Sequence, residues 1–222
     1  MTRLSWVKLL RDGAVVVASV YVAIVLEGIS ETRDRRVDAE QALVRLQTEL
    51  QQDRADLDVI MAAQADRQVR HQRIDAWLDR PAEIPADSMT EHFTALFSVN
   101  RTMFPRNSSW TTMVASSQLT YLDDPELVAR LANFYENLNE RLEYNGALYD
   151  EWVKHLATTS APQVWDRVSG RLLTTDVGDV VRFRGELAGL LDLTIGFYGL
   201  LEEWGLELDE VLEEVERHRA AR

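Results

Sequence analysis

Histidines are the side chains best suited to acid–base or metal chemistry in this sequence, because it contains no cysteine. His155 follows Glu151 by four residues and His218 follows Glu214 by four, so each pair shares one face of a helix. A di-iron bundle would need Glu-x-x-His twice, and a zinc protease would need His-Glu-x-x-His. Neither pattern occurs, so we expect these two histidines at the surface or at the edge of a packed seam.

The other candidates for catalysis show no recognised arrangement. His71 and His92 have no companions at the spacing of metal ligands, and no serine lies in a Gly-x-Ser-x-Gly elbow. No glycine-rich loop follows a strand to hold a phosphate. Paired carboxylates such as Asp123-Asp124 are common in a chain with 37 acidic residues. The sequence therefore predicts no catalytic, cofactor-binding or metal-binding residue, and a protein that is not an enzyme.

The net charge and the length of the chain exclude further classes of function and architecture. The net charge of -13 argues against a nucleic-acid partner, because phosphate binding needs clustered Lys and Arg. The 222 residues suffice for one domain with a single sizeable core plus an appendage.

The appendage is an apolar segment near the N-terminus. Residues 13–26 contain no charge, and Leu9, Leu10 and Ile29 extend the apolar stretch to roughly 20 positions, the length that a bilayer core requires. The segment also resembles the apolar part of a signal peptide, with Gly28 and Ser30 as small residues near a cleavage point. We expect an uncleaved membrane anchor in preference to a signal peptide, an interfacial helix or a core helix.

The flanks of this segment suit a membrane boundary. Trp6, Lys8 and Arg11 fit the headgroup layer on the N-terminal side. Basic residues occur on both sides, so the charge bias is nearly even, but a short basic tail is easily kept in the cytoplasm. We expect a cytoplasmic tail at 1–12, a transmembrane helix at 13–29 and an acidic helical bundle outside the cytoplasm at 30–222.

Glu27 is the one charge near the end of the expected span. An acid there is unfavourable unless it reaches the interface or finds a partner. It either marks the outer membrane boundary or meets a polar group on a neighbouring membrane helix, and Ala14, Ala18 and Ala23 supply small residues for such packing.

A long helix should follow the anchor without interruption. Residues 30–78 contain no Pro and no Gly, and Pro81 and Pro85 end the pattern. An apolar seam with 3-4 spacing, interrupted by Asp53, comprises Leu43, Leu46, Leu50, Leu57 and Ile60.

Shorter helices are expected at Met89–Phe97 and Trp110–Ser117, after the cap candidates Ser88 and Ser109. The sequence "LDDPEL" then places Asp124 at an N-cap and Pro125 in the first turn of a helix that runs to about Ala157. Its expected core stripe is Leu127, Leu131, Phe134, Leu138, Leu142, Leu148, Trp152 and Leu156.

The last expected helix spans Val180–His218 and is unusually rich in glycine. Each helical glycine costs about 1 kcal/mol relative to alanine. We expect these glycines to be retained because they admit a closely packed neighbour: Gly185, Gly189, Gly196, Gly199 and Gly205.

Three stretches resemble a known family: "RVDAEQALVRLQTELQQDRADLD", "SSWTTMVASSQLTYLDDPELVARLANFYENLNE" and the C-terminal helix. They are similar to bacterial single-pass membrane proteins classed as a domain of unknown function. The resemblance implies a short basic tail, one membrane helix and a helical extracytoplasmic domain. Its members usually carry Gly-Lys or Gly-Asn after a small-residue pair, where this chain has Gln118-Leu119 after Ser116-Ser117.

The sequence therefore predicts an all-α fold in which a transmembrane helix continues into a long helix of an antiparallel bundle or coiled coil. Two functions remain open. One is a non-enzymatic accessory or scaffolding subunit of a bacterial membrane complex, such as a photosynthetic, respiratory or transport complex, whose partners are integral membrane subunits and the lipid bilayer. The other is a sensor-like membrane-anchored module that binds a small ligand. Either would lie in the bacterial inner membrane.

Overall fold

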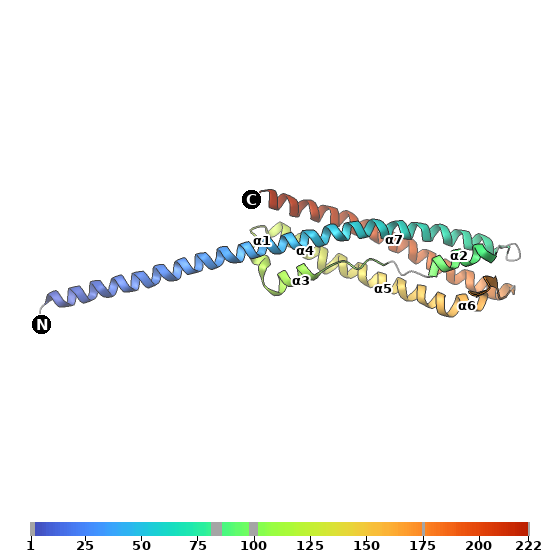
Figure 1. The fold of residues 1–222 in the computed structure, drawn as a ribbon, viewed down its shortest axis with the longest axis horizontal. Helices are drawn as coiled ribbons and strands as arrows, with labels where there is room; N and C mark the ends of the chain where they lie inside the picture. Colours follow the sequence, from blue (N-terminus) through green and yellow to red (C-terminus); the bar gives the residue numbers. More distant parts are fainter. Residues whose placement is uncertain (1–2, 81–85, 98–101, 175, 222) are drawn as a thin grey trace.

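The computed structural model describes residues 3–80, 86–97, 102–174 and 176–221, with side chains throughout except at residues 3–18 and 86–89. Within these residues the chain is a helical bundle, which confirms the all-α class. The long helix α1 (Arg3–Leu78) packs against the long helix α7 (Val177–Ala220). Figure 1 shows α1 running the length of the molecule, with its N-terminal part projecting beyond the bundle.

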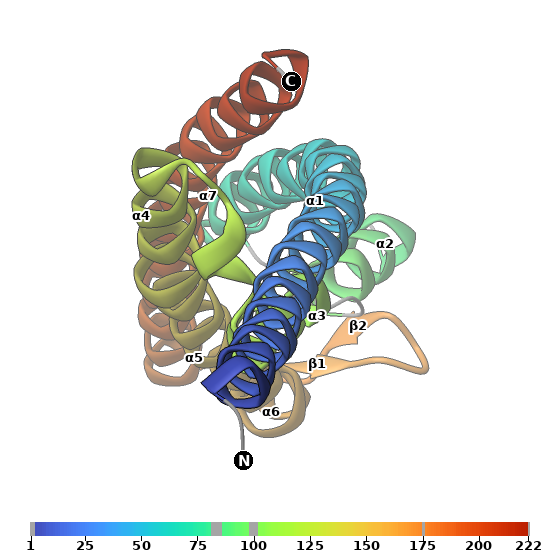
Figure 2. The ribbon, with the colours of Figure 1, turned by 90° about the vertical axis from the view of Figure 1, so that its left-hand side faces the viewer.

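The remaining elements connect these two helices. They are α2 (Ala86–Phe97), α3 (Ser108–Ala115), the 3-10 turn η2 (Gln118–Tyr121), α4 (Pro125–Asn133), the π-helical η3 (Phe134–Asn139), α5 (Glu140–His155), the π-helical η4 (Leu156–Ser160), α6 (Ala161–Val164), β1 (Trp165–Asp166) and β2 (Arg171–Leu172). The two short strands pair antiparallel, with Trp165 opposite Leu172. Seen along the long axis, α4 and α5 lie on one side of α1, and α2 and the hairpin lie on the other (Figure 2).

Helix α1 is continuous from the apolar segment into the bundle, as the absence of proline predicted. Its residues 19–38 are exposed on every side. Burial begins at Ala39 and follows the predicted seam through Leu43, Leu46, Leu50 and Leu57. The seam packs with residues of α3, α4 and α7 in one apolar core.

Two predicted helix starts can be compared with the structure. Asp124 is the N-cap of α4, where its side chain accepts a hydrogen bond of 3.0 Å from the backbone N of Leu127. Ser109 is not the cap of α3, because that helix begins at Ser108 and Ser109 lies inside its first turn. The cap candidate Ser88 and the stop signals Pro81 and Pro85 fall outside the residues with described side chains or backbone.

The helix predicted from Pro125 to about Ala157 continues to Val164 and contains two π-helical turns. A π turn adds one residue to an α-helix and so rotates the rest of the helix by roughly 100°. After η3 the inward residues are Tyr149 and Val153 (1% exposed each), while Leu148 and Trp152 are 43% and 36% exposed. The prediction that Leu148 and Trp152 lie in the core was therefore wrong.

The bundle contains two apolar cores along its length. One joins the first buried part of α1 to α3, α4 and the C-terminal half of α7, and includes Leu43, Leu50, Met113, Leu131, Phe134 and Trp204. The other joins the end of α1 to α2, α5 and the first half of α7, and includes Ile74, Phe93, Leu96, Val153, Phe183 and Leu190. Ion pairs between helices flank the cores, among them Arg54–Asp209, Arg130–Glu214, Arg141–Glu203 and Arg184–Asp75.

Candidate functional site

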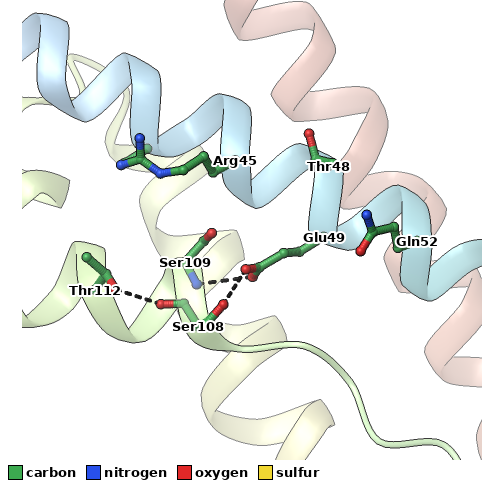
Figure 3. A pocket seen from close by; sticks show the side chains of 8 residues that line it. Arg45, Thr48, Glu49, Gln52, Ser108, Ser109 and Thr112 are labelled. Carbon is green, nitrogen blue, oxygen red and sulfur yellow. Dashed lines mark hydrogen bonds between the residues drawn. The ribbon is translucent and has the colours of Figure 1, made fainter.

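A cavity of about 500 Å³ lies between α1 and α3 (Figure 3). Its lining residues are Ala42, Arg45, Thr48, Glu49 and Gln52 from α1 and Ser108, Ser109 and Thr112 from α3. Hydroxyl, amide and charged groups thus surround an opening between two helices, which makes this cavity the first candidate for a binding site.

Glu49 closes the inner wall of the cavity. Its carboxylate accepts hydrogen bonds from the hydroxyl of Ser108 and from the backbone N of Ser109, the latter at 3.1 Å. Figure 3 shows the Glu49 side chain reaching across to the first turn of α3. Asn107, at the N-cap position, makes no side-chain capping bond. A carboxylate from α1 therefore takes the place of the local cap and complements the positive end of the α3 dipole.

Asp53, one turn further along α1, fixes the segment that leads into α3. Its side chain is 1% exposed and accepts hydrogen bonds from the backbone N of Arg106 (2.9 Å) and from Arg106 Nη1 (2.5 Å). Burial raises the pKa of Asp53, and the two bonds from Arg106 oppose that shift. Arg106 also lies 2.8 Å from Asp56. The polar residue that interrupted the predicted seam is thus an anchor for the 102–107 connector.

The polar groups of this cavity are suited to binding a small polar molecule. Glu49 is engaged by Ser108 and Ser109, and the cavity contains no histidine. Arg45 makes no ion pair with any described residue. A small polar molecule with an anionic group would find one cation and several hydroxyl groups here.

A second polar feature separates the two apolar cores. Arg67 donates a hydrogen bond to the hydroxyl of Tyr149, which in turn donates to Gln64 Oε1 at 3.2 Å. Thr194 Oγ1 lies 3.5 Å from the same hydroxyl. These four residues are 5% exposed or less. These four residues form a buried polar layer. A buried polar group without a hydrogen-bond partner is destabilising, so the hydrogen bonds of this layer favour the observed alignment of α1, α5 and α7.

His71 lies one helical turn beyond Arg67 and is 3% exposed. Its Nε2 atom has no hydrogen-bond partner among the described residues. Burial, with a smaller contribution from the charge of Arg67, lowers the pKa of His71 to about 4. The ring is therefore neutral at pH 7. Sequence reasoning did not anticipate this position, because nothing in the spacing distinguishes a buried histidine from an exposed one.

The other histidines lie elsewhere. His218 is buried, with Nδ1 3.1 Å from Asp124 and Nε2 3.3 Å from Glu40, whereas His155 is exposed at the surface as predicted. His92 is buried against Arg70 and Arg73. Among the described residues, no group of three or more His, Asp or Glu side chains could hold a metal ion.

Comparison with known proteins places the chain in a family. A family of unknown function, DUF6090, matches residues 12–186. The chain belongs to DUF6090. No curated protein and no solved structure gave a match. The DUF6090 match includes the cavity between α1 and α3 and all members of the buried polar layer except Thr194.

The predicted membrane-interface and partner-contact residues all lie on α1. The side chains of Trp6, Lys8, Arg11, Ala14 and Ala18 fall outside the described residues. Ala23 and Glu27 are described, and both are exposed on the projecting part of α1. Within the described part of the chain, no helix has a stretch long and apolar enough to cross a membrane.

The predicted packing glycines of α7 behave differently from one another. A Cβ atom at Gly185, Gly196 or Gly199 would meet no atom within 4 Å, whereas one at Gly189 would lie 3.5 Å from the ring of Trp152. The closest approach is at Gly205, where a Cβ would lie 2.7 Å from Leu57 Cδ2. Close packing inside the described chain therefore does not account for Gly185, Gly196 and Gly199, because these positions face outward.

Proposed function

We propose that this DUF6090 protein is a non-enzymatic accessory or scaffolding subunit of a larger bacterial membrane protein complex. One transmembrane helix at 13–29 tethers it, its basic tail at 1–12 stays in the cytoplasm, and its helical bundle lies outside. Integral membrane subunits and the lipid bilayer are its partners.

The observation that carries this proposal is the apolar surface of the projecting helix. Seven large apolar residues between positions 20 and 29 are 42–68% exposed, and they lie on all sides of α1: Val20, Tyr21, Val22, Ile24, Val25, Leu26 and Ile29. A helix that is apolar all round is stable when surrounded by lipid or by other apolar helices. The bundle begins only at Ala39, so its own core supplies no cover for this segment.

The continuity of α1 supports a scaffolding role. Ten residues separate Ile29 from Ala39, which corresponds to roughly 15 Å along an α-helix. Leu78 would lie roughly 75 Å from the outer end of the span. Because no break interrupts α1 over this distance, the bundle has a fixed direction relative to the anchor and can hold a partner at a defined height.

Topology and assembly can be tested on the full-length protein. We expect it to fractionate with membranes and to resist extraction by high salt and alkali. A reporter fused after Arg222 should be active only outside the cytoplasm. Purification in mild detergent should bring down stoichiometric integral membrane subunits. Release from membranes by alkali, or purification without any partner, would contradict the proposal.

The α1–α3 cavity favours the alternative function, a membrane-anchored module that binds a small ligand. A Thr112→Trp substitution would fill the cavity from an exposed position. If ligand binding is the function, this variant should lose thermal stabilisation by any small anionic compound that stabilises the wild type. If scaffolding is the function, the variant should assemble normally.

A further inference from the structure

An outer groove runs between α5 and α7 and encloses a cavity of about 220 Å³. Its apolar lining comprises Leu148, Tyr149, Leu193, Gly196, Phe197 and Leu200. Leu148 and Leu193 form its opposite edges and are 43% and 39% exposed, and Trp152 continues the α5 edge by one turn. Paired apolar edges over a buried aromatic floor are unusual for a surface that meets only water.

Two large apolar side chains of α5 face outward beside this groove. Leu142 and Tyr149, two helical turns apart, share the buried face of α5, so Leu148 and Trp152 lie off that face and are exposed. The sequence thus keeps apolar residues at positions where the fold of this chain does not bury them.

Glycine lines the α7 side of the same groove. Gly196 is exposed, and a Cβ there would meet no atom within 4 Å. A glycine in a helix interior costs about 1 kcal/mol relative to alanine. A flat helix face of this kind allows the backbone of another helix to approach closely.

The chain itself leaves the outer groove uncovered. The connector before α3 contacts α5 at Gly146, where a Cβ would lie 3.4 Å from Thr102. Among the described residues, none of the elements beyond α5 and α7 lines the outer groove.

The charged residues around the outer groove indicate which kind of helix could bind there. Arg141 is neutralised by Glu203, with hydrogen bonds of 2.9 and 2.7 Å. Asp192 in the groove lining and Glu151, one turn from Leu148, are exposed and make no ion pair with a described residue. The uncompensated charge is therefore negative. A second copy of this chain, with a net charge of -13, would bring like charges together.

We infer that the outer groove docks an amphipathic helix of a partner subunit, one with an apolar ridge flanked by Lys or Arg. The ridge lies between Leu148 and Leu193 over Gly196, and its basic flanks meet Asp192 and Glu151. This inference rests on the proposed scaffolding function and specifies which surface of the bundle performs it.

The test uses the full-length protein purified from its own membranes. Leu148→Arg and Leu193→Arg each replace a partly exposed apolar edge with a charge that repels a basic partner. Val69→Arg is the matched control, because Val69 is an exposed valine on α1 (54%). We expect the amount of partner that co-purifies with each groove variant to be at least tenfold lower than with wild type. A loss of about this size is typical when an anchoring contact is removed. The control should retain the wild-type amount, and all three should keep the wild-type melting temperature within a few degrees.

A photo-crosslinker identifies the occupant. In Gly196→p-benzoylphenylalanine, we expect a cross-linked peptide from another protein with apolar residues at helical spacing and flanking Lys or Arg. If the groove variants retain as much partner as Val69→Arg, the groove assignment is overturned but the scaffold proposal stands. A cross-link to a second copy of the chain would have the same two consequences. Loss in all three variants would also overturn it. If the wild type carries no partner, the scaffold proposal itself fails.

Discussion

Ser117, which links α3 to η2, has a left-handed conformation, with φ of 57° and ψ of 24°. It is the one non-glycine residue with positive φ in the described chain. Such a conformation costs a residue with a side chain roughly 1–2 kcal/mol. Glycine tolerates this conformation without that cost, whereas here serine makes the turn.

We therefore expect Ser117→Gly to increase the free energy of unfolding by about 0.5–1 kcal/mol, because the strain removed exceeds the entropy that glycine adds to the unfolded chain. Urea denaturation of the detergent-solubilised protein would measure it. Ser116→Gly is the control, because Ser116 has a φ of -92° and should lose stability. Equal effects at both positions would rule out the conformational explanation.

His71 should make stability depend on pH. Its pKa is lowered to about 4 in the folded chain from an ordinary value of 6.5, mainly by burial. Between these values the unfolded chain binds more protons, so stability falls as the pH drops from about 7 to 4. His71→Gln should remove up to about 3 kcal/mol of this loss. Denaturation midpoints of wild type and variant across this pH range would measure it, and exposed His155→Gln should follow the wild type.

At the scale of elements, the sequence predicted what periodicity and helix caps determine. The unbroken α1, its seam and the Asp124 cap all follow from local residue types. The π turns do not, because one extra residue in a helix changes neither the helix-forming residue types nor the caps from which the helix is predicted. The α1–α3 cavity was missed for a similar reason, since Glu49 and Ser108 meet only after the connector folds back.

The glycines of α7 allow a test within one helix. Gly185→Ala and Gly196→Ala should each stabilise the purified protein by about 0.5–1 kcal/mol, because the added methyl group meets no neighbour and alanine favours helix. Gly205→Ala should give no gain or a net loss, because its Cβ would displace the buried side chain of Leu57. Thermal unfolding of the three variants measures these effects. A gain at Gly205 equal to that at Gly185 would show that Leu57 moves without cost.

At the scale of the whole molecule, α1 combines two kinds of surface in one continuous helix. Its N-terminal part presents apolar side chains to all sides, and its C-terminal part forms one wall of both cores. A partner that contacts the bundle and the membrane helix would bind through two linked sites. Such linkage raises the effective concentration of the second contact to the millimolar range.

The contribution of the proposed membrane helix to assembly can be separated from its role as a tether. Replacing residues 12–29 with an unrelated apolar span of equal length should keep the protein in the membrane but reduce the amount of partner that co-purifies.

Glu27→Leu should also reduce the amount of partner that co-purifies, without impairing insertion, because removing a charge favours insertion. The expected physical reason is that an acid at the edge of a membrane span would be stabilised by a polar group on a neighbouring helix. Quantitative mass spectrometry of detergent-purified complexes would measure both variants, with Glu31→Gln, whose carboxylate lies outside the span beside Arg35, as the matched control. Full retention of partner in both variants would mean that the bundle alone holds the complex, and that Glu27 marks only the membrane boundary.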